Sequence, residues 1–97
     1  MGRLSGQSAL VTGAGRGFGR AIAMKLAADG AHVTLVSRSA AQLEEVVAEI
    51  EALGGRAIAV PADVTDPQQV AAACDEARST FGAPSILVSN AGVPWPF

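Results

Sequence analysis

The feature that most constrains the fold is a glycine cluster, with four glycines in the seven positions 13–19, directly after the short apolar run at residues 8–12. Apolar residues at helical spacing follow the cluster, so it joins an expected buried strand to an expected helix. At such a junction, backbone N–H groups and the positive end of the helix dipole face the same point. The sequence therefore predicts a strand, a tight glycine loop and a helix that together form an anion-binding site.

The spacing of the glycines separates the candidate nucleotide-binding motifs. A strict GxGxxG pattern fails because Phe18 occupies the place of its third glycine, whereas GxxxGxG fits through Gly13, Gly17 and Gly19. No Gly-Lys-Ser/Thr sequence follows, which excludes a P-loop. The spacing predicts a dinucleotide-binding loop, and the alternative is a turn whose glycines only let the strand and the helix pack closely.

Apolar runs and helical patterns alternate along the whole chain. We expect strands at residues 8–12, 31–37, 57–60 and 86–89, and helices at residues 21–29, 40–53 and 67–81. Continuous apolar strands that alternate with helices are typical of a parallel sheet covered on both faces. Crossover handedness favours the strand order 3-2-1-4. The predicted fold is α/β: a Rossmann-type doubly wound parallel sheet of four strands and three helices, truncated after one strand of its second half.

Composition and charge exclude several classes of protein. The 97 residues suffice for one domain at most, and seven basic residues spread along a chain of net charge −2 argue against a nucleic-acid partner. Cys74 is the single cysteine, so an intrachain disulfide is excluded; no Cys/His spacing indicates a metal site, and we expect a cytoplasmic protein. The first residues contain no apolar segment typical of a secretory signal or a membrane span.

The glycine loop resembles the cofactor fingerprint of the short-chain dehydrogenases/reductases, TGxxxGxG. Thr12, Gly13, Gly17 and Gly19 match that fingerprint in full. The resemblance implies that this loop binds a nicotinamide dinucleotide. Arg16 and Phe18, which lie within the loop, join Gly13, Gly17 and Gly19 as cofactor-binding candidates.

Two later motifs extend the resemblance along the chain in the expected order. Asp63 and Val64, after the third expected strand, resemble the family's acidic pair near the adenine. Asn90, Ala91 and Gly92, after the fourth, resemble its NNAG motif, although Ser89 replaces the first Asn. The alternative roles are a turn or helix-entry carboxylate for Asp63 and a turn-capping amide for Asn90.

The end of the second expected strand favours NADP over NAD. In a dinucleotide-binding fold, a carboxylate at this position binds the ribose 2′-OH of NAD, whereas a nearby Arg accommodates the 2′-phosphate of NADP. Here Ser37 and Arg38 occupy the position, and Arg16 of the glycine loop is a second candidate for the phosphate. We therefore expect NADP as the preferred cofactor, with NAD as the alternative. The competing interpretation is that both arginines are solvated charges in loops.

The resemblance implies hydride transfer between the nicotinamide and an alcohol or carbonyl substrate, with a Tyr, a Lys and a Ser as catalytic residues. The chain contains no tyrosine, so its YxxxK pair is absent, and Lys25 belongs to the first expected helix. We assign no catalytic residue here. We expect residues 1–97 to be the amino-terminal portion of one cofactor-binding domain, inactive alone.

Two alternative functions remain at this point. A non-catalytic dinucleotide-binding or interaction module would use the same glycine loop without chemistry. An S-adenosylmethionine-dependent methyltransferase would use Gly13, Gly15 and Gly17 as GxGxG, although Val11 stands where that class has an acid. The apolar fourth strand, at residues 86–89, would leave an open edge, so we expect a homo-oligomer or a complementing carboxy-terminal segment.

Overall fold

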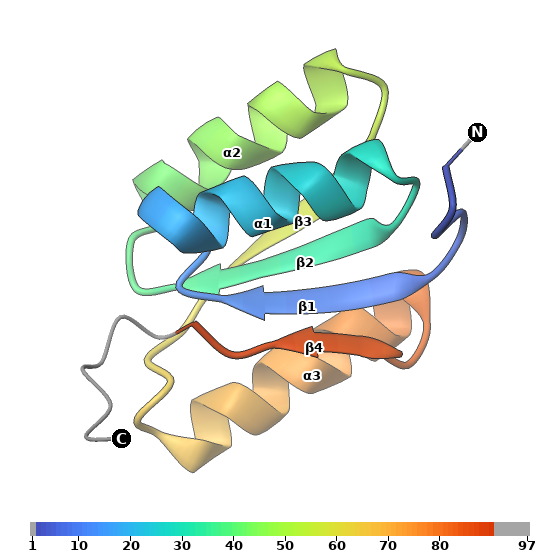
Figure 1. Cartoon of the computed structure of the whole chain (residues 1–97). Coiled ribbons are helices and arrows are strands. Elements are labelled where there is room, and N and C mark those ends of the chain that lie inside the picture. The colour runs from blue at the N-terminus through green and yellow to red at the C-terminus, as the bar shows by residue number, and fades with distance from the viewer. Residues whose placement is uncertain (1, 91–97) are drawn as a thin grey trace, which may run out of the picture.

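The protein is a single parallel β-sheet with helices on both faces, seen in a computed structural model that describes residues 2–90 (Figure 1). Strands and helices alternate strictly along the chain. In order they are β1 (Ser8–Thr12), α1 (Gly17–Ala28), β2 (His32–Ser37), α2 (Ala40–Ala52), β3 (Arg56–Pro61), α3 (Pro67–Phe81) and β4 (Ile86–Val88). All strand pairs are parallel and their order is β3-β2-β1-β4. The predicted fold class and strand order are confirmed.

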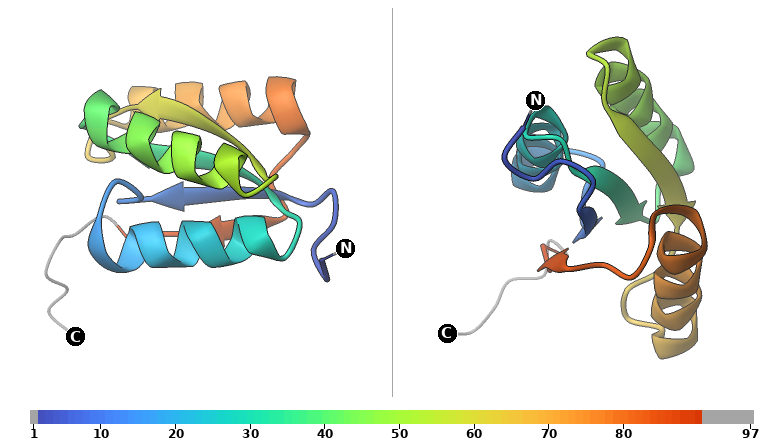
Figure 2. Two further views of the ribbon diagram at one scale, coloured as in Figure 1. Left: turned by 90° about the horizontal axis from the view of Figure 1, so that it is seen from above. Right: turned by 90° about the vertical axis from the view of Figure 1, so that its right-hand side faces the viewer.

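Two apolar clusters hold the three layers together. Helices α1 and α2 cover one face of the sheet and α3 covers the other (Figure 2). Val11 and Leu35 face the α1/α2 side, where they pack with Leu43 of α2, whereas Leu10 and Val36 face the α3 side. Because successive side chains of a strand point to opposite faces, a strand covered on both sides must be apolar throughout. This explains the continuous apolar runs of β1 and β2.

The helix boundaries follow the capping signals in the sequence. Ser39 caps α2 by accepting a hydrogen bond from the backbone N–H of Gln42, and Asp66 caps α3 by accepting from that of Gln68. Pro67 occupies the first turn of α3, where its missing N–H costs nothing. Gly54, with a φ of 89°, follows the end of α2 in a left-handed conformation that favours glycine.

Three expected elements have different boundaries in the structure, by four residues at the start of α1 and by one residue at the ends of β3 and β4. Helix α1 begins at Gly17 rather than at residue 21, because the glycine loop itself supplies the first turn. Strand β4 ends at Val88 rather than at Ser89: the N–H of Asn90 donates to the Thr12 side chain instead of continuing the ladder. Strand β3 extends over Arg56–Pro61, in register with all of β2.

The parallel register brings all the strand ends to one edge. Thr12 pairs with Val36, and Ser37 pairs with Pro61, so the loops after β1, β2 and β3 emerge side by side. The loop after β4 joins them there, since Val11 pairs with Val88. In parallel open sheets this carboxyl edge is where ligands bind. Of the helices in residues 2–90, none has both the length and the apolar character that crossing a bilayer requires.

Candidate functional site

The loop between β1 and α1 requires glycine at three positions for different reasons. Gly13 and Gly17 have φ angles of 63° and 58°, in the left-handed region that favours glycine. Gly19 lies against the start of its own loop: a Cβ there would sit 2.0 Å from the carbonyl oxygen of Gly13. The bare backbone at Gly19 therefore lets the first turn of α1 pack against the start of the loop.

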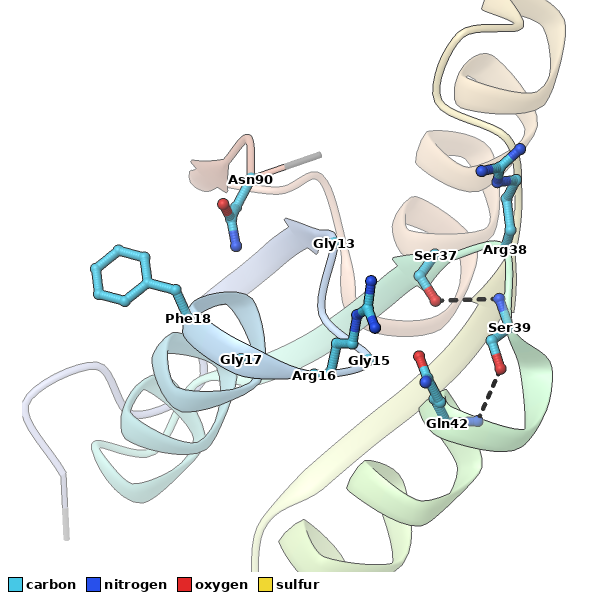
Figure 3. Close-up of a pocket in the computed structure, with 10 residues that line it drawn as sticks. All are labelled: Gly13, Gly15, Arg16, Gly17, Phe18, Ser37, Arg38, Ser39, Gln42 and Asn90. Carbon is cyan, nitrogen blue, oxygen red and sulfur yellow. Dashed lines mark hydrogen bonds between the residues drawn. The ribbon is translucent and has the colours of Figure 1, made fainter. Parts of the chain in front are cut away.

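A cavity with a volume of about 690 Å³ lies over this loop (Figure 3). Its walls come from three segments at the carboxyl edge of the sheet. The lining residues are Gly13, Gly15, Arg16, Gly17 and Phe18 of the loop and the start of α1, Ser37, Arg38, Ser39 and Gln42 at the β2–α2 junction, and Asn90 after β4. Two guanidinium groups and no carboxylate line it, so the cavity favours an anion.

A smaller cavity of about 150 Å³ adjoins the first at the end of β3. Gly13, Ser37 and Arg38 line both cavities, and the smaller one adds Asp63 and Val64 from the loop before α3. Arg38 thus stands at the junction of the two spaces. A charged group at this junction can contact ligands in either cavity.

The sequence-derived candidates converge on these two cavities. Those that line them are Gly13, Arg16, Gly17, Phe18, Ser37, Arg38, Asp63, Val64 and Asn90. Gly19 is buried beneath the loop and acts through its backbone position. Ala91 and Gly92 lie outside the described residues. Phe18, 74% exposed, projects beside Asn90 at the mouth of the larger cavity (Figure 3).

Asp63 is held in one orientation by its neighbour Thr65. Its Oδ1 atom accepts hydrogen bonds from the Thr65 hydroxyl at 2.7 Å and from the Thr65 backbone N–H at 2.9 Å. These two bonds, together with the positive charge of Arg38, hold the pKa of the Asp63 carboxyl below its ordinary value of 3.8. Asp63 is therefore ionised at neutral pH and presents its second oxygen as a hydrogen-bond acceptor.

Asn90 is positioned by the first residue of the glycine fingerprint. Its backbone N–H donates to Thr12 Oγ1 at 2.8 Å, and the Thr12 hydroxyl lies 3.5 Å from the Val88 carbonyl oxygen, to which it donates. The Asn90 side-chain nitrogen lies 2.8 Å from the place that a Cβ on Gly19 would occupy. The bare backbone of Gly19 therefore makes room for Asn90.

Three residues of the site were missed by the sequence analysis as ligand contacts. Gly15 belongs to the GxGxG pattern considered for a methyltransferase, and Ser39 and Gln42 have the spacing of a helix cap, yet all three line the larger cavity. Their position in the sequence was the available signal. The first turn of a helix that follows a parallel strand lies at the same edge of the sheet as the glycine loop. A Cβ at Gly15 would sit 2.8 Å from Gln42 Oε1, so the flexible Gln42 side chain would have to shift to make room for it.

The arrangement fits a dinucleotide. The curved glycine loop offers backbone amides at the N-terminus of α1 to a pyrophosphate, and the guanidinium groups of Arg16 and Arg38 offer charge-assisted bonds to a further phosphate. Residues 2–90 hold no group of three or more His, Cys, Asp and Glu side chains arranged to bind a metal ion. These residues suit the binding of a phosphorylated ligand.

Comparison with known proteins agrees with this chemistry. The family model described as short chain dehydrogenase matches residues 7–97. Short chain dehydrogenase/reductase AacuN of Aspergillus aculeatus is 52% identical over 91 residues, which cover 93% of this chain and 34% of that protein.

Two solved structures are similar in fold as well. A short chain dehydrogenase from Burkholderia cenocepacia, in complex with NADP, is 54% identical with a TM-score of 0.88, over 94% of this chain and 38% of that one. The L-sorbose reductase of Gluconobacter frateurii, complexed with NADPH and L-sorbose, is 41% identical with a TM-score of 0.87, over 94% and 35%.

The chain thus spans about a quarter to a third of the length of the curated relatives it matches. The residues matched by the family model, 7–97, include the glycine loop, the end of β2, the Asp63 loop and Asn90. The sequence motifs, the parallel sheet and the paired cavities at its carboxyl edge all agree with that match. The chain belongs to the short-chain dehydrogenase/reductase family.

Proposed function

We propose that this chain is the NADP(H)-binding portion of an oxidoreductase that transfers hydride between the nicotinamide and an alcohol or carbonyl substrate. One observation carries the proposal: two arginines, two serines and a glutamine line a cavity that opens over a fingerprint glycine loop and contains no carboxylate. The bound NADP in a relative that is 54% identical supports it. Family membership removes the methyltransferase alternative.

The preference for NADP over NAD rests on the end of β2. Ser37 stands where an NAD-specific carboxylate would accept from the ribose 2′-OH, and the adjacent Arg38 supplies positive charge for a 2′-phosphate. Arg16 lines the same cavity from the opposite loop, as Figure 3 shows. In this assignment Asp63 and Val64, in the smaller cavity, contact the adenine, and Asn90 contacts the cofactor from the larger cavity. Ala91 and Gly92 remain candidates from the sequence alone.

Cofactor titration tests the preference directly. We expect the purified protein to bind NADPH more tightly than NADH, and Arg38→Ala to weaken NADPH binding about tenfold while NADH binding changes little. Arg78→Ala is the matched control, because Arg78 pairs with Asp75 on α3 and lines neither cavity. Equal affinity for both cofactors, unchanged by Arg38→Ala, would refute the NADP assignment.

The catalytic groups are proposed to lie outside these 97 residues. The chain has no tyrosine to act as the acid/base, and Lys25 lies on α1, in an ion pair with Asp29. We therefore expect residues 1–97, as one domain portion, to bind cofactor without turnover. A non-catalytic dinucleotide-binding module predicts the same behaviour for this chain. The two functions are separated by whether the native reading frame encodes a YxxxK pair.

The outer edge of β4 supports a proposed partner. Among the described strands, β4 pairs with β1 alone, and Leu87 is 69% exposed. We infer that a second copy of the chain or a complementing carboxy-terminal segment covers this apolar edge in a cytoplasmic protein. Sedimentation of residues 1–97 should show self-association that Leu87→Lys reduces. A cooperative, folded monomer in both forms would contradict the inference.

A further inference from the structure

The first turn of α2 contains a capping box of which only half forms. In a full box, the N-cap hydroxyl accepts from the third helical N–H, and the third side chain returns a bond to the N-cap N–H. Here Ser39 Oγ accepts from the Gln42 N–H at 3.2 Å, but the Ser39 N–H donates to Ser37 Oγ at 3.3 Å instead. Because the Ser39 N–H already donates to Ser37 Oγ, the side-chain amide of Gln42 takes no part in capping the helix.

The side-chain amide of Gln42 faces the larger cavity. Gln42 is half-buried and lies over Gly15, with its Oε1 atom 2.8 Å from the place of a Cβ there. Figure 3 shows it directed into the space between the Arg16 loop and the Ser37–Ser39 turn. Within residues 2–90 no hydrogen bond uses this amide, although the backbone N–H of the same residue is paired. A half-buried amide without a protein partner is available to a ligand.

The surroundings of Gln42 indicate which ligand group it would meet. Arg16 and Arg38 are the charged side chains that line the cavity, and Ser37 and Ser39 each keep a hydroxyl proton free to donate while accepting a backbone N–H. A phosphate is acceptor-rich and suits this concentration of donors. A half-turn of the Gln42 amide exchanges Oε1, which faces Gly15, for Nε2, whose N–H adds a donor without adding charge.

We propose, on the basis of the proposed NADP site, that Gln42 is a specificity-determining residue whose side-chain amide donates to the ribose 2′-phosphate. Selection of NADP then depends on the first turn of α2 as well as on the end of β2. A carboxylate at residue 42 would repel the phosphate, so Gln42→Glu tests whether residue 42 lies beside it. Gln42→Leu removes the donor without adding charge and tests the hydrogen bond itself.

The test measures binding of ligand pairs that differ by the 2′-phosphate. NADPH is compared with NADH, and 2′,5′-ADP with 5′-AMP, by calorimetric titration of the wild-type protein and its variants. We expect Gln42→Glu to weaken NADPH and 2′,5′-ADP about tenfold and Gln42→Leu about threefold, with NADH and 5′-AMP within about twofold. Gln68→Glu adds the same charge to the first turn of α3, lines neither cavity, and should change none of the four affinities.

The outcomes separate this inference from the function on which it rests. An equal loss for ligands with and without the 2′-phosphate, or no loss for the 2′-phosphorylated ligands in Gln42→Leu, would overturn the role of Gln42. If Arg38→Ala still abolishes the NADPH preference in that case, the NADP site itself stands. If the wild-type protein shows no preference for the 2′-phosphorylated ligands, both fail. Circular dichroism of each variant verifies that it is folded.

Discussion

The backbone N–H of Asn90 donates to the hydroxyl of Thr12 at 2.8 Å, across 78 positions of sequence. Thr12 is buried, and its hydroxyl also donates to the Val88 carbonyl oxygen at 3.5 Å. One hydroxyl thus fastens the end of β4 to the end of β1, at the point where β4 stops pairing. The Asn90 side chain is brought to the mouth of the cavity by this contact.

Removing the Thr12 hydroxyl should release Asn90. Thr12→Val keeps the shape of the side chain but leaves the Asn90 N–H without its acceptor, so we expect a loss of about 1–2 kcal/mol in the free energy of unfolding. Cofactor affinity should fall in parallel. Thr12→Ser retains the hydroxyl and should preserve most of both quantities. Urea unfolding and NADPH titration measure them, and a Val variant that behaves like Ser would contradict the role of this bond.

Gly19 should tolerate no side chain. A Cβ there meets the Gly13 carbonyl oxygen at 2.0 Å, so Gly19→Ala must displace the glycine loop, and we expect about 1–3 kcal/mol of destabilisation together with loss of cofactor binding.

Gly54→Ala is the control for this substitution. Gly54 has a φ of 89° and open space around it, so the change should cost about 1 kcal/mol from backbone strain alone. Cofactor binding should survive, since Gly54 lies at the far end of α2. Thermal unfolding and NADPH titration of both variants distinguish a displaced loop from general instability.

The α1/α2 side of the sheet should depend on Leu43. This side chain is fully buried within the larger apolar cluster, so Leu43→Ala is expected to lower the free energy of unfolding by about 2–5 kcal/mol. Leu53, on the same helix's end, is 79% exposed, and Leu53→Ala should stay within about 0.5 kcal/mol of wild type. Chemical denaturation of the pair measures how much of the stability comes from burial.

The lowered pKa of Asp63 should depend on Thr65. The Thr65 hydroxyl is the first cause of the lowering, followed by its backbone N–H, so Thr65→Val should move the pKa of Asp63 up toward 3.8 and Thr65→Ser should not. Carboxyl ¹³C NMR titration measures the shift.

The sign of the pH dependence follows from that lowering. A carboxyl with a lower pKa in the folded state than in the unfolded state contributes stability that is complete above the unfolded value of about 3.8–3.9. That stability is lost as the pH falls through the lowered folded pKa. Thr65→Val should therefore reduce the acid sensitivity of unfolding between pH 4 and the folded pKa, and an unchanged acid transition would count against it.

Local signals in the chain were sufficient to predict the fold. The apolar runs of β1 and β2, the N-caps Ser39 and Asp66 and the glycine after α2 each depend on residues close in sequence. The end of β4 is a boundary that a long-range contact decides. Strand β4 ends early because Thr12 accepts a hydrogen bond from the N–H of Asn90, and that contact has no local signature.

By itself, the sequence determined the order of the elements, the parallel sheet and the glycine loop, because hydrophobic period, capping and turn chemistry act over short distances. Only the tertiary structure decided that the Gln42 side chain lies over Gly15 instead of capping α2, and that Arg38 lines both cavities. Both results require the parallel register, which brings the ends of separate strands to one edge and sets side chains from different elements against each other.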